Sequence, residues 1–182
     1  MLRAQRALTT GRLDVAATAL VQAEALKADT LAVTGLQLNL LARRGEAEAA
    51  LRLPVETTAT HPGSAKALNV VCWFKATHNL RLASALGDCD AALNIAADTP
   101  AHLDSRGLVR LCSHDEKGSI ADYSAALRHS PDLVSSLFGQ GIAWARLGDR
   151  NRALADLSRA RSIRPEIDAI WADYGVTPPA GF

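Results

Sequence analysis

The sequence predicts an all-α fold in which pairs of helices repeat along the chain, and three observations lead to this prediction. First, the segment Ser130–Pro165 holds two apolar helical runs, the first around Gly141, separated by a break at Gly148. A glycine at such a break favours the left-handed backbone that ends a helix. Second, a shift of 34 residues brings Gly141 onto Gly107 and the closing proline onto Pro131. Third, Ala and Leu dominate while aromatic residues make up only 4% of the chain, a composition that favours helices.

The period and the small residues within it resemble the tetratricopeptide repeat (TPR) family, in which helix pairs recur every 34 residues. The family's small residues at repeat places 8, 20 and 27, its Gly-Asp turn and its terminal proline all occur within Val134–Glu166. Over five repeats those three places hold Gly, Ala, Ser or Thr in 13 of 15 cases, and the exceptions are Leu38 and Trp73. The resemblance implies a right-handed α-solenoid of about five helix-turn-helix repeats, of the bacterial type.

The period divides the chain into repeats within one solenoid domain over residues 1–182. The predicted repeats cover residues 1–30, 31–64, 65–99, 100–133 and 134–166, followed by a capping helix over 166–175 and a tail over 176–182. Pro54 falls inside the second helix of its repeat, so we expect that helix to end at Leu53, with a bend over Val55–Ala59. In the next repeat we expect the second helix over Leu82–Ala96. The first helix of the array would begin before Met1, which favours a chain that begins inside a longer protein.

The family resemblance also implies a concave groove lined by the first helix of each repeat. The groove residues it predicts are Asn39, Arg43, Val70, Phe74, His78, Asp104, Leu108, Leu111, Phe138, Ile142 and Arg146. Their apolar members would form a strip that anchors an extended or helical peptide, and the charged ones would fix its register. Asn39 alone matches the Lys and Asn pattern of the family's carboxylate clamps, so we expect no clamp for a peptide's terminal carboxylate.

The sequence offers no pattern that predicts catalysis, a metal or another cofactor. It holds no His-x-x-x-His or Cys-x-x-Cys spacing. His78 and Cys112 could approach each other across adjacent repeats, but a nucleophilic pair also needs an orienting group. The glycines of Gly139–Gly141 lie within a helix and form no phosphate loop. We therefore expect a protein that is not an enzyme.

Composition limits the partners and the compartment. A formal net charge of +1 argues against binding nucleic acid or an anionic membrane surface. The sequence contains no run of 18 apolar residues and no signal-peptide pattern at Met1. We expect a soluble protein of either the cytoplasm or the periplasm.

Two features concern the core. The three cysteines are an odd number without paired spacing, which predicts no disulfide framework. Arg106 stands where the repeat usually holds an apolar residue. We expect its charge to be partly buried and paired with Asp122 or Asp104, because a buried charge needs a partner.

The function that these patterns favour is a protein-interaction scaffold or adaptor that binds a peptide or protein surface in the concave groove. One alternative is a regulatory or substrate-recruiting region of a larger enzyme whose catalytic domain precedes Met1. Another is self-association through the incomplete first repeat. The sequence does not name the partner.

Overall fold

The computed structural model describes residues 2–26, 30–50, 52 and 63–182. Within these residues the secondary structure is helical, without strands. The helices are α1 (Leu2–Thr9), α2 (Leu13–Ala25), α3 (Thr30–Arg43), α4 (Ala47–Ala50), α6 (Ala65–Thr77), α7 (Leu82–Ile95), α8 (Pro100–Cys112), α9 (Glu116–His129), α10 (Val134–Arg146), α11 (Arg150–Ile163) and α12 (Ile167–Asp173).

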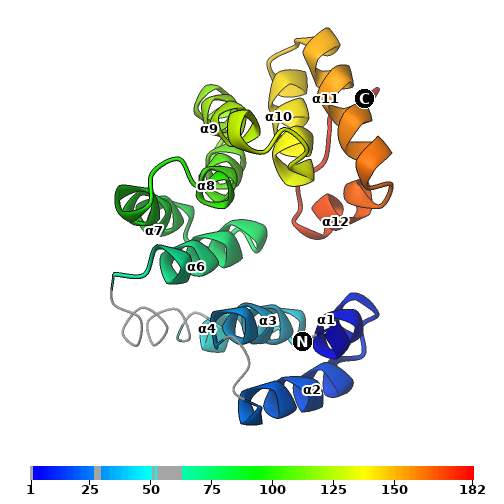
Figure 1. Ribbon diagram of the computed structural model, residues 1–182. Helices are drawn as coiled ribbons and strands as arrows, with labels where there is room; N and C mark the ends of the chain where they lie inside the picture. The colour runs from blue at the N-terminus through cyan, green and yellow to red at the C-terminus, as the bar shows by residue number, and fades with distance from the viewer. Residues whose placement is uncertain (1, 27–29, 51, 53–62) are drawn as a thin grey trace.

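Successive helices fold back on each other in pairs, and the pairs stack side by side as an α-solenoid of helical repeats, as predicted (Figure 1). The helices α6, α8 and α10 come first in their pairs and contact one another in sequence order. Figure 1 shows α12 turned back inside the curve of the array, on the side that faces the N-terminal helices. The expected helix end at Leu53 and the bend over Val55–Ala59 lie outside the described residues. The division into five repeats of one domain stays a prediction.

The turns between paired helices use left-handed backbone and side-chain caps. Gly148, at the predicted break, has φ +81°, and His114 takes φ +60° at the equivalent place one repeat earlier. The following helices begin with capping aspartates. The side chain of Asp115 accepts from the Gly118 backbone N–H at 3.0 Å, and Asp149 caps α11 in the same way. Such caps satisfy backbone donors that a helix start leaves unpaired.

Close helix contacts explain the small residues of the repeat. Tyr123 of α9 is fully buried, and its ring lies against Gly107 of α8 and Gly139 of α10. A Cβ atom at Gly107 would stand 2.7 Å from the ring, well inside van der Waals contact, and one at Gly139 would also overlap Tyr123. Glycine at these places therefore lets one aromatic ring fill the space among three helices.

A network of charges also links the helices, and it confirms the predicted pairing of Arg106. The Arg106 guanidinium donates to both carboxylate oxygens of Asp122, at 2.7 and 3.0 Å, and to Asp90 at 2.9 Å. Arg110 adds a second cation 2.9 Å from Asp122, whose side chain is only 4% exposed. This bidentate pairing compensates the Asp122 carboxylate for the loss of its hydration on burial.

The prediction that the cysteines form no disulfide is wrong for one pair. Cys72 of α6 and Cys89 of α7 are bonded, with their Cα atoms 5.5 Å apart. Residues about 17 apart face each other in an antiparallel helix pair, so the two cysteines meet through the fold and not through a short motif. Cys112 is unpaired and half-buried, and burial raises the pKa of its thiol to about 11, against the opposing effect of the Arg146 charge.

Reduction of this disulfide is expected to lower the free energy of unfolding by about 3 kcal/mol, because the bond closes a loop of 17 residues in the unfolded chain. The measurement is chemical denaturation with and without a reducing agent. A Cys112→Ala variant should respond to the reductant as the parent does, whereas a Cys72→Ala/Cys89→Ala double variant should not respond at all. Equal midpoints for the oxidised and reduced parent would contradict the expectation.

Candidate functional site

The C-terminal helix α12 occupies part of the concave face. Trp171 of α12 is only 1% exposed, and its ring lies 5.3 Å from that of Phe138 on α10. Just after the helix, Tyr174 meets Trp73 of α6 edge-on, with ring centroids 6.0 Å apart. Helix α12 and the residue that follows it therefore do more than cover the last repeat, because Tyr174 reaches α6 as well.

This arrangement divides the predicted groove residues into two groups. The buried ones are Phe74, Asp104, Leu108, Leu111, Phe138 and Ile142. The partly or fully exposed ones are Asn39, Arg43, Val70, His78 and Arg146. The expectation of an open apolar strip is thus corrected. Trp171 packs against Phe138, and Phe74 belongs to a core cluster with Leu38 and Ala50. Apolar side chains that other helices cover cannot serve as exposed anchors.

Three of the exposed group come together beside α12. Asn39, Arg43 and His78 line a cavity of about 560 Å³, which we call the α3 cavity, together with Ile170, Asp173, Tyr174 and residues of α1. Arg43 reaches across it to Asp173 at 3.4 Å. Burial lowers the pKa of His78, opposed by its contact with the Phe74 carbonyl oxygen and aided by the nearby Arg43 charge. Arg146 lies apart from this group and donates to the Leu111 carbonyl oxygen at 2.9 Å.

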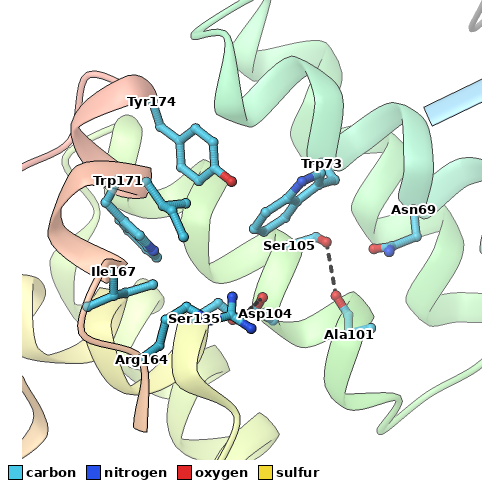
Figure 2. Close-up of a pocket in the computed structure, with 11 residues that line it drawn as sticks. Asn69, Trp73, Ala101, Asp104, Ser105, Ser135, Arg164, Ile167, Trp171 and Tyr174 are labelled. Carbon is cyan, nitrogen blue, oxygen red and sulfur yellow. Dashed lines mark hydrogen bonds between the residues drawn. The ribbon is translucent and has the colours of Figure 1, made fainter. Parts of the chain in front are cut away.

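A second, smaller cavity of about 260 Å³ lies where α6, α8, α10 and α12 meet (Figure 2). We call it the α12 cavity. Its lining residues are Asn69, Trp73, Ala101, Asp104, Ser105, Ser135, Arg164, Ile167, Ile170, Trp171 and Tyr174. Figure 2 shows the rings of Trp171, Tyr174 and Trp73 arranged around the cavity, with Asp104 and Ser135 below them and Ser105 beside Trp73. Arg164, Ile170 and Tyr174 line both cavities, so the two are neighbours beside α12.

Asp104 is the buried charge of the α12 cavity. Its carboxylate accepts from Ser136 at 2.6 Å and from Ser135 at 2.8 Å, which links α8 to α10. Burial raises the pKa of Asp104 to about 6, and the two serine hydroxyls oppose this rise. The sequence predicted Asp104 as a groove residue, and in the structure its side chain is buried and lines the α12 cavity.

Lowering the pH from 7 to 5 is expected to stabilise the protein through Asp104. A carboxyl whose pKa is higher in the folded state binds its proton more tightly there, so stability rises as the pH falls through about 6. The gain over this window is about 1 kcal/mol. Urea denaturation of the parent and of Asp104→Asn at both pH values measures it, because Asp156, whose pKa burial also raises to about 6, is present in both proteins. Parallel pH profiles would contradict the assignment.

Asn69 contributes an acceptor without a partner. Its Oδ1 atom is buried, and no hydrogen-bond donor lies within reach among the residues that the structure describes. A buried carbonyl oxygen in this state costs free energy that a donor would recover. Arg164 brings a positive charge to the lining of the same cavity. Its side chain is about half exposed, and its guanidinium lies 3.9 Å from the Glu166 carboxylate.

Of the residues that line the α12 cavity, sequence reasoning named Asp104 alone as a site residue. The aromatic, amide and charged side chains that it missed are Asn69, Trp73, Arg164, Trp171 and Tyr174. Trp73 stood out only as one of the two exceptions at the repeat places that usually hold a small residue. Figure 2 shows its ring directed into the α12 cavity. Trp171 and Tyr174 were expected on the capping helix, but their spacing does not reveal which face of the solenoid that helix covers.

The described residues contain no group of three His, Cys, Asp or Glu side chains that could hold a metal ion. Over the same residues, none of the helices has the length and apolar character needed to cross a membrane. The Cys112 thiol lies 3.9 Å from the Ala76 carbonyl oxygen, and the His78 ring contacts the carbonyl of Phe74. The pairing of His78 with Cys112 that the sequence left open is not among the contacts of either side chain in the described part of the chain.

Stacked helix pairs that enclose a groove define the molecule as a helical repeat solenoid, and comparison with solved structures shows that its fold is of the TPR type. TTC0263, a thermophilic TPR protein of Thermus thermophilus, matches with a TM-score of 0.73 and 17% identity, over 94% of this chain and 93% of that one. The crystal structure of MamA protein matches with a TM-score of 0.57 and 15% identity, over 91% and 90% of the two chains. The MamA RS-1 ArsTM double mutant matches with a TM-score of 0.61 and 16% identity, over 91% of this chain and 93% of that one. No family model and no curated protein matches the sequence.

Proposed function

We propose that this chain is a protein-interaction scaffold that binds a segment of a partner polypeptide in the groove beside α12. The observation that carries the proposal is the adjacency of the α3 and α12 cavities, which share Arg164, Ile170 and Tyr174 in their linings. The α3 cavity alone, at about 560 Å³, is within the range of protein ligand sites, and the α12 cavity extends it by about 260 Å³. Concave faces of stacked repeats are suited to extended polypeptide segments. The role requires no catalysis and no cofactor.

Affinity capture from a lysate of the source organism tests this proposal with matched variants. Ile170→Asp places a charge where the two cavities join, and Arg43→Ala removes a lining charge of the α3 cavity. Ile163→Asp makes the same apolar-to-acid change on α11, where the side chain is 45% exposed and lines neither cavity. A partner held by the parent and by Ile163→Asp but lost by Ile170→Asp and reduced by Arg43→Ala supports the proposal. Circular dichroism checks that each variant is folded, and identical capture by all four folded proteins would refute it.

Self-association is a second candidate that one observation favours. Leu2, Val21 and Leu26 of the N-terminal helix pair and its end are 85%, 65% and 81% exposed. Large apolar side chains gathered on one end of a solenoid favour contact with another chain, since terminal repeats usually carry a polar outer face. Sedimentation at several concentrations, with Val21→Lys as the comparison, tests it, and a monomer at all concentrations would exclude it. Among the described residues, no observation favours the role of an enzyme's regulatory region.

Of the two compartments that the sequence left open, we propose the periplasm. The Cys72–Cys89 disulfide carries this proposal, because disulfides persist in oxidising compartments and are rare in the cytosol. Thiol trapping in intact cells measures the state of the pair. Free thiols at both positions in freshly quenched cells would overturn the proposal.

A further inference from the structure

We infer that the α12 cavity is a subsite for one cationic side chain, that of a lysine or arginine in the bound polypeptide segment. This inference rests on the proposed function and names the chemistry by which the groove would recognise its partner. Three independent features of the lining lead to it: a buried carboxylate, an unpartnered carbonyl oxygen and a set of aromatic rings.

The polar atoms at the cavity call for a hydrogen-bond donor. Asp104 accepts one hydrogen bond at each carboxylate oxygen, from Ser136 and Ser135, which leaves further lone pairs on both atoms. Asn69 Oδ1 is buried and has no donor among the described residues. An ammonium or guanidinium group carries several N–H donors and no acceptor, so it is the kind of group that either acceptor would bind. An anion would pair with Arg164, but it would also bring a further acceptor to a lining that contains Asp104 and Asn69.

The apolar part of the lining fits the rest of such a side chain. The rings of Trp73 and Tyr174 stand at 85° to each other and form two walls of a corner. Trp171 and Ile167 continue these walls along α12. Aromatic faces attract a cation within about 6 Å of the ring centroid, and most strongly in a desolvated site. The methylene stem of lysine or arginine gains by packing along the same surface.

Arg164 is the one cation among the described lining residues, and it opposes the proposed ligand. Its half-exposed side chain is attached at the loop before α12, and its nearest acidic partner is Glu166 at 3.9 Å, too far for a strong hydrogen bond. The Arg164 charge therefore lowers the affinity for a cation. A purely apolar cavity would not respond to this charge, so removal of Arg164 should strengthen binding only if the ligand is cationic.

The test is titration of the full ¹⁵N-labelled protein with three capped tripeptides, acetyl-Ala-Lys-Ala-amide, acetyl-Ala-Arg-Ala-amide and acetyl-Ala-norleucine-Ala-amide, followed by NMR. The lysine or arginine peptide is expected to shift the indole resonances of Trp73 and Trp171 and not that of Trp144. The norleucine peptide should bind at least about tenfold more weakly, because it lacks the charged hydrogen bonds. Asp104→Asn and Asn69→Leu should each weaken the binding of the cationic peptide about tenfold, whereas Arg164→Ala should strengthen its binding. Thermal melting confirms that each variant is folded.

Two results would overturn the inference. One is equal affinity for the lysine, arginine and norleucine peptides, which would make the cavity a general apolar subsite. The other is the absence of indole shifts with either cationic peptide at 10 mM, about the weak limit of a useful subsite. If either occurs while partner capture remains sensitive to Ile170→Asp and Arg43→Ala, the scaffold function stands and only the cationic subsite falls. If capture is insensitive as well, both proposals fall.

Discussion

Replacing Trp171 with alanine is expected to detach α12 from the concave face and to lower the free energy of unfolding by about 3–5 kcal/mol, the range for truncating a fully buried aromatic side chain. Trp171 is only 1% exposed and lies against Phe138, which would face solvent once α12 leaves. Chemical denaturation gives the loss in stability, and hydrogen exchange of residues 167–173 reports whether α12 has opened.

Trp144→Ala is the matched control for this prediction. Trp144 is half-buried on α10, and its outer face carries the Arg152 guanidinium 3.6 Å from the ring centroid. Its removal forfeits part of the packing and one cation–π contact of about 0.5–1 kcal/mol, and it leaves α12 in place. If Trp144→Ala costs as much as Trp171→Ala, or if exchange in α12 is unchanged by Trp171→Ala, the packing of α12 on Phe138 is wrong.

Two glycine-to-alanine replacements are expected to change stability in opposite directions. In Gly139→Ala the new methyl group overlaps the buried ring of Tyr123, and overpacking of this kind costs about 1–3 kcal/mol. In Gly87→Ala, on the exposed side of α7, the methyl group meets no atom within 4 Å. There the better helix propensity of alanine should stabilise the protein by about 0.5–1 kcal/mol.

Urea denaturation of the two glycine variants measures both effects in the same assay. The comparison removes the helix-propensity gain that the two substitutions share, so the difference between them isolates the contact with Tyr123. In a Tyr123→Leu background, Gly139→Ala should cost less than it does in the parent because the ring is gone. Stabilisation of similar size in both single variants would show that α9 and α10 do not approach as closely as described.

The sequence was sufficient to predict the helices, their pairing and the charged contacts within a repeat. These features repeat with the chain, so one well-marked unit such as Ser130–Pro165 predicts the others. Arg106 was predicted on another ground: its charge stands at a usually apolar place of the repeat, which led to an expected pairing with Asp122 or Asp104, and Asp122 provides it. The bounds of α7, expected over Leu82–Ala96 and found at Leu82–Ile95, follow from the same register.

The site could not be predicted as well, because its features depend on contacts between segments far apart in the sequence. A helical pattern shows which side of a helix is apolar, but not what covers that side. Phe138 looked like an exposed anchor because nothing in the pattern places Trp171 upon it. Asn69 and Arg164 carry no periodic signal, and they become site residues only because α12 returns to the concave face. The Cys72–Cys89 pair was missed for a different reason: its members face each other within one predicted helix pair, but they have no short motif spacing.

The return of α12 has a consequence for any affinity measured at this face. Only three residues, Arg164 to Glu166, separate α12 from α11, so the helix is held beside its own site at an effective concentration in the millimolar range or above. A partner segment that needs the surface under Trp171 competes with this tethered occupant, and its apparent dissociation constant rises by the inverse of the fraction of molecules in which α12 is displaced. A segment that uses only the two cavities beside α12 avoids this competition. Tight partners of the intact chain are therefore expected to bind alongside α12. A chain that ends before Ile167 lacks this helix, and we expect it to bind partners that need the surface under Trp171.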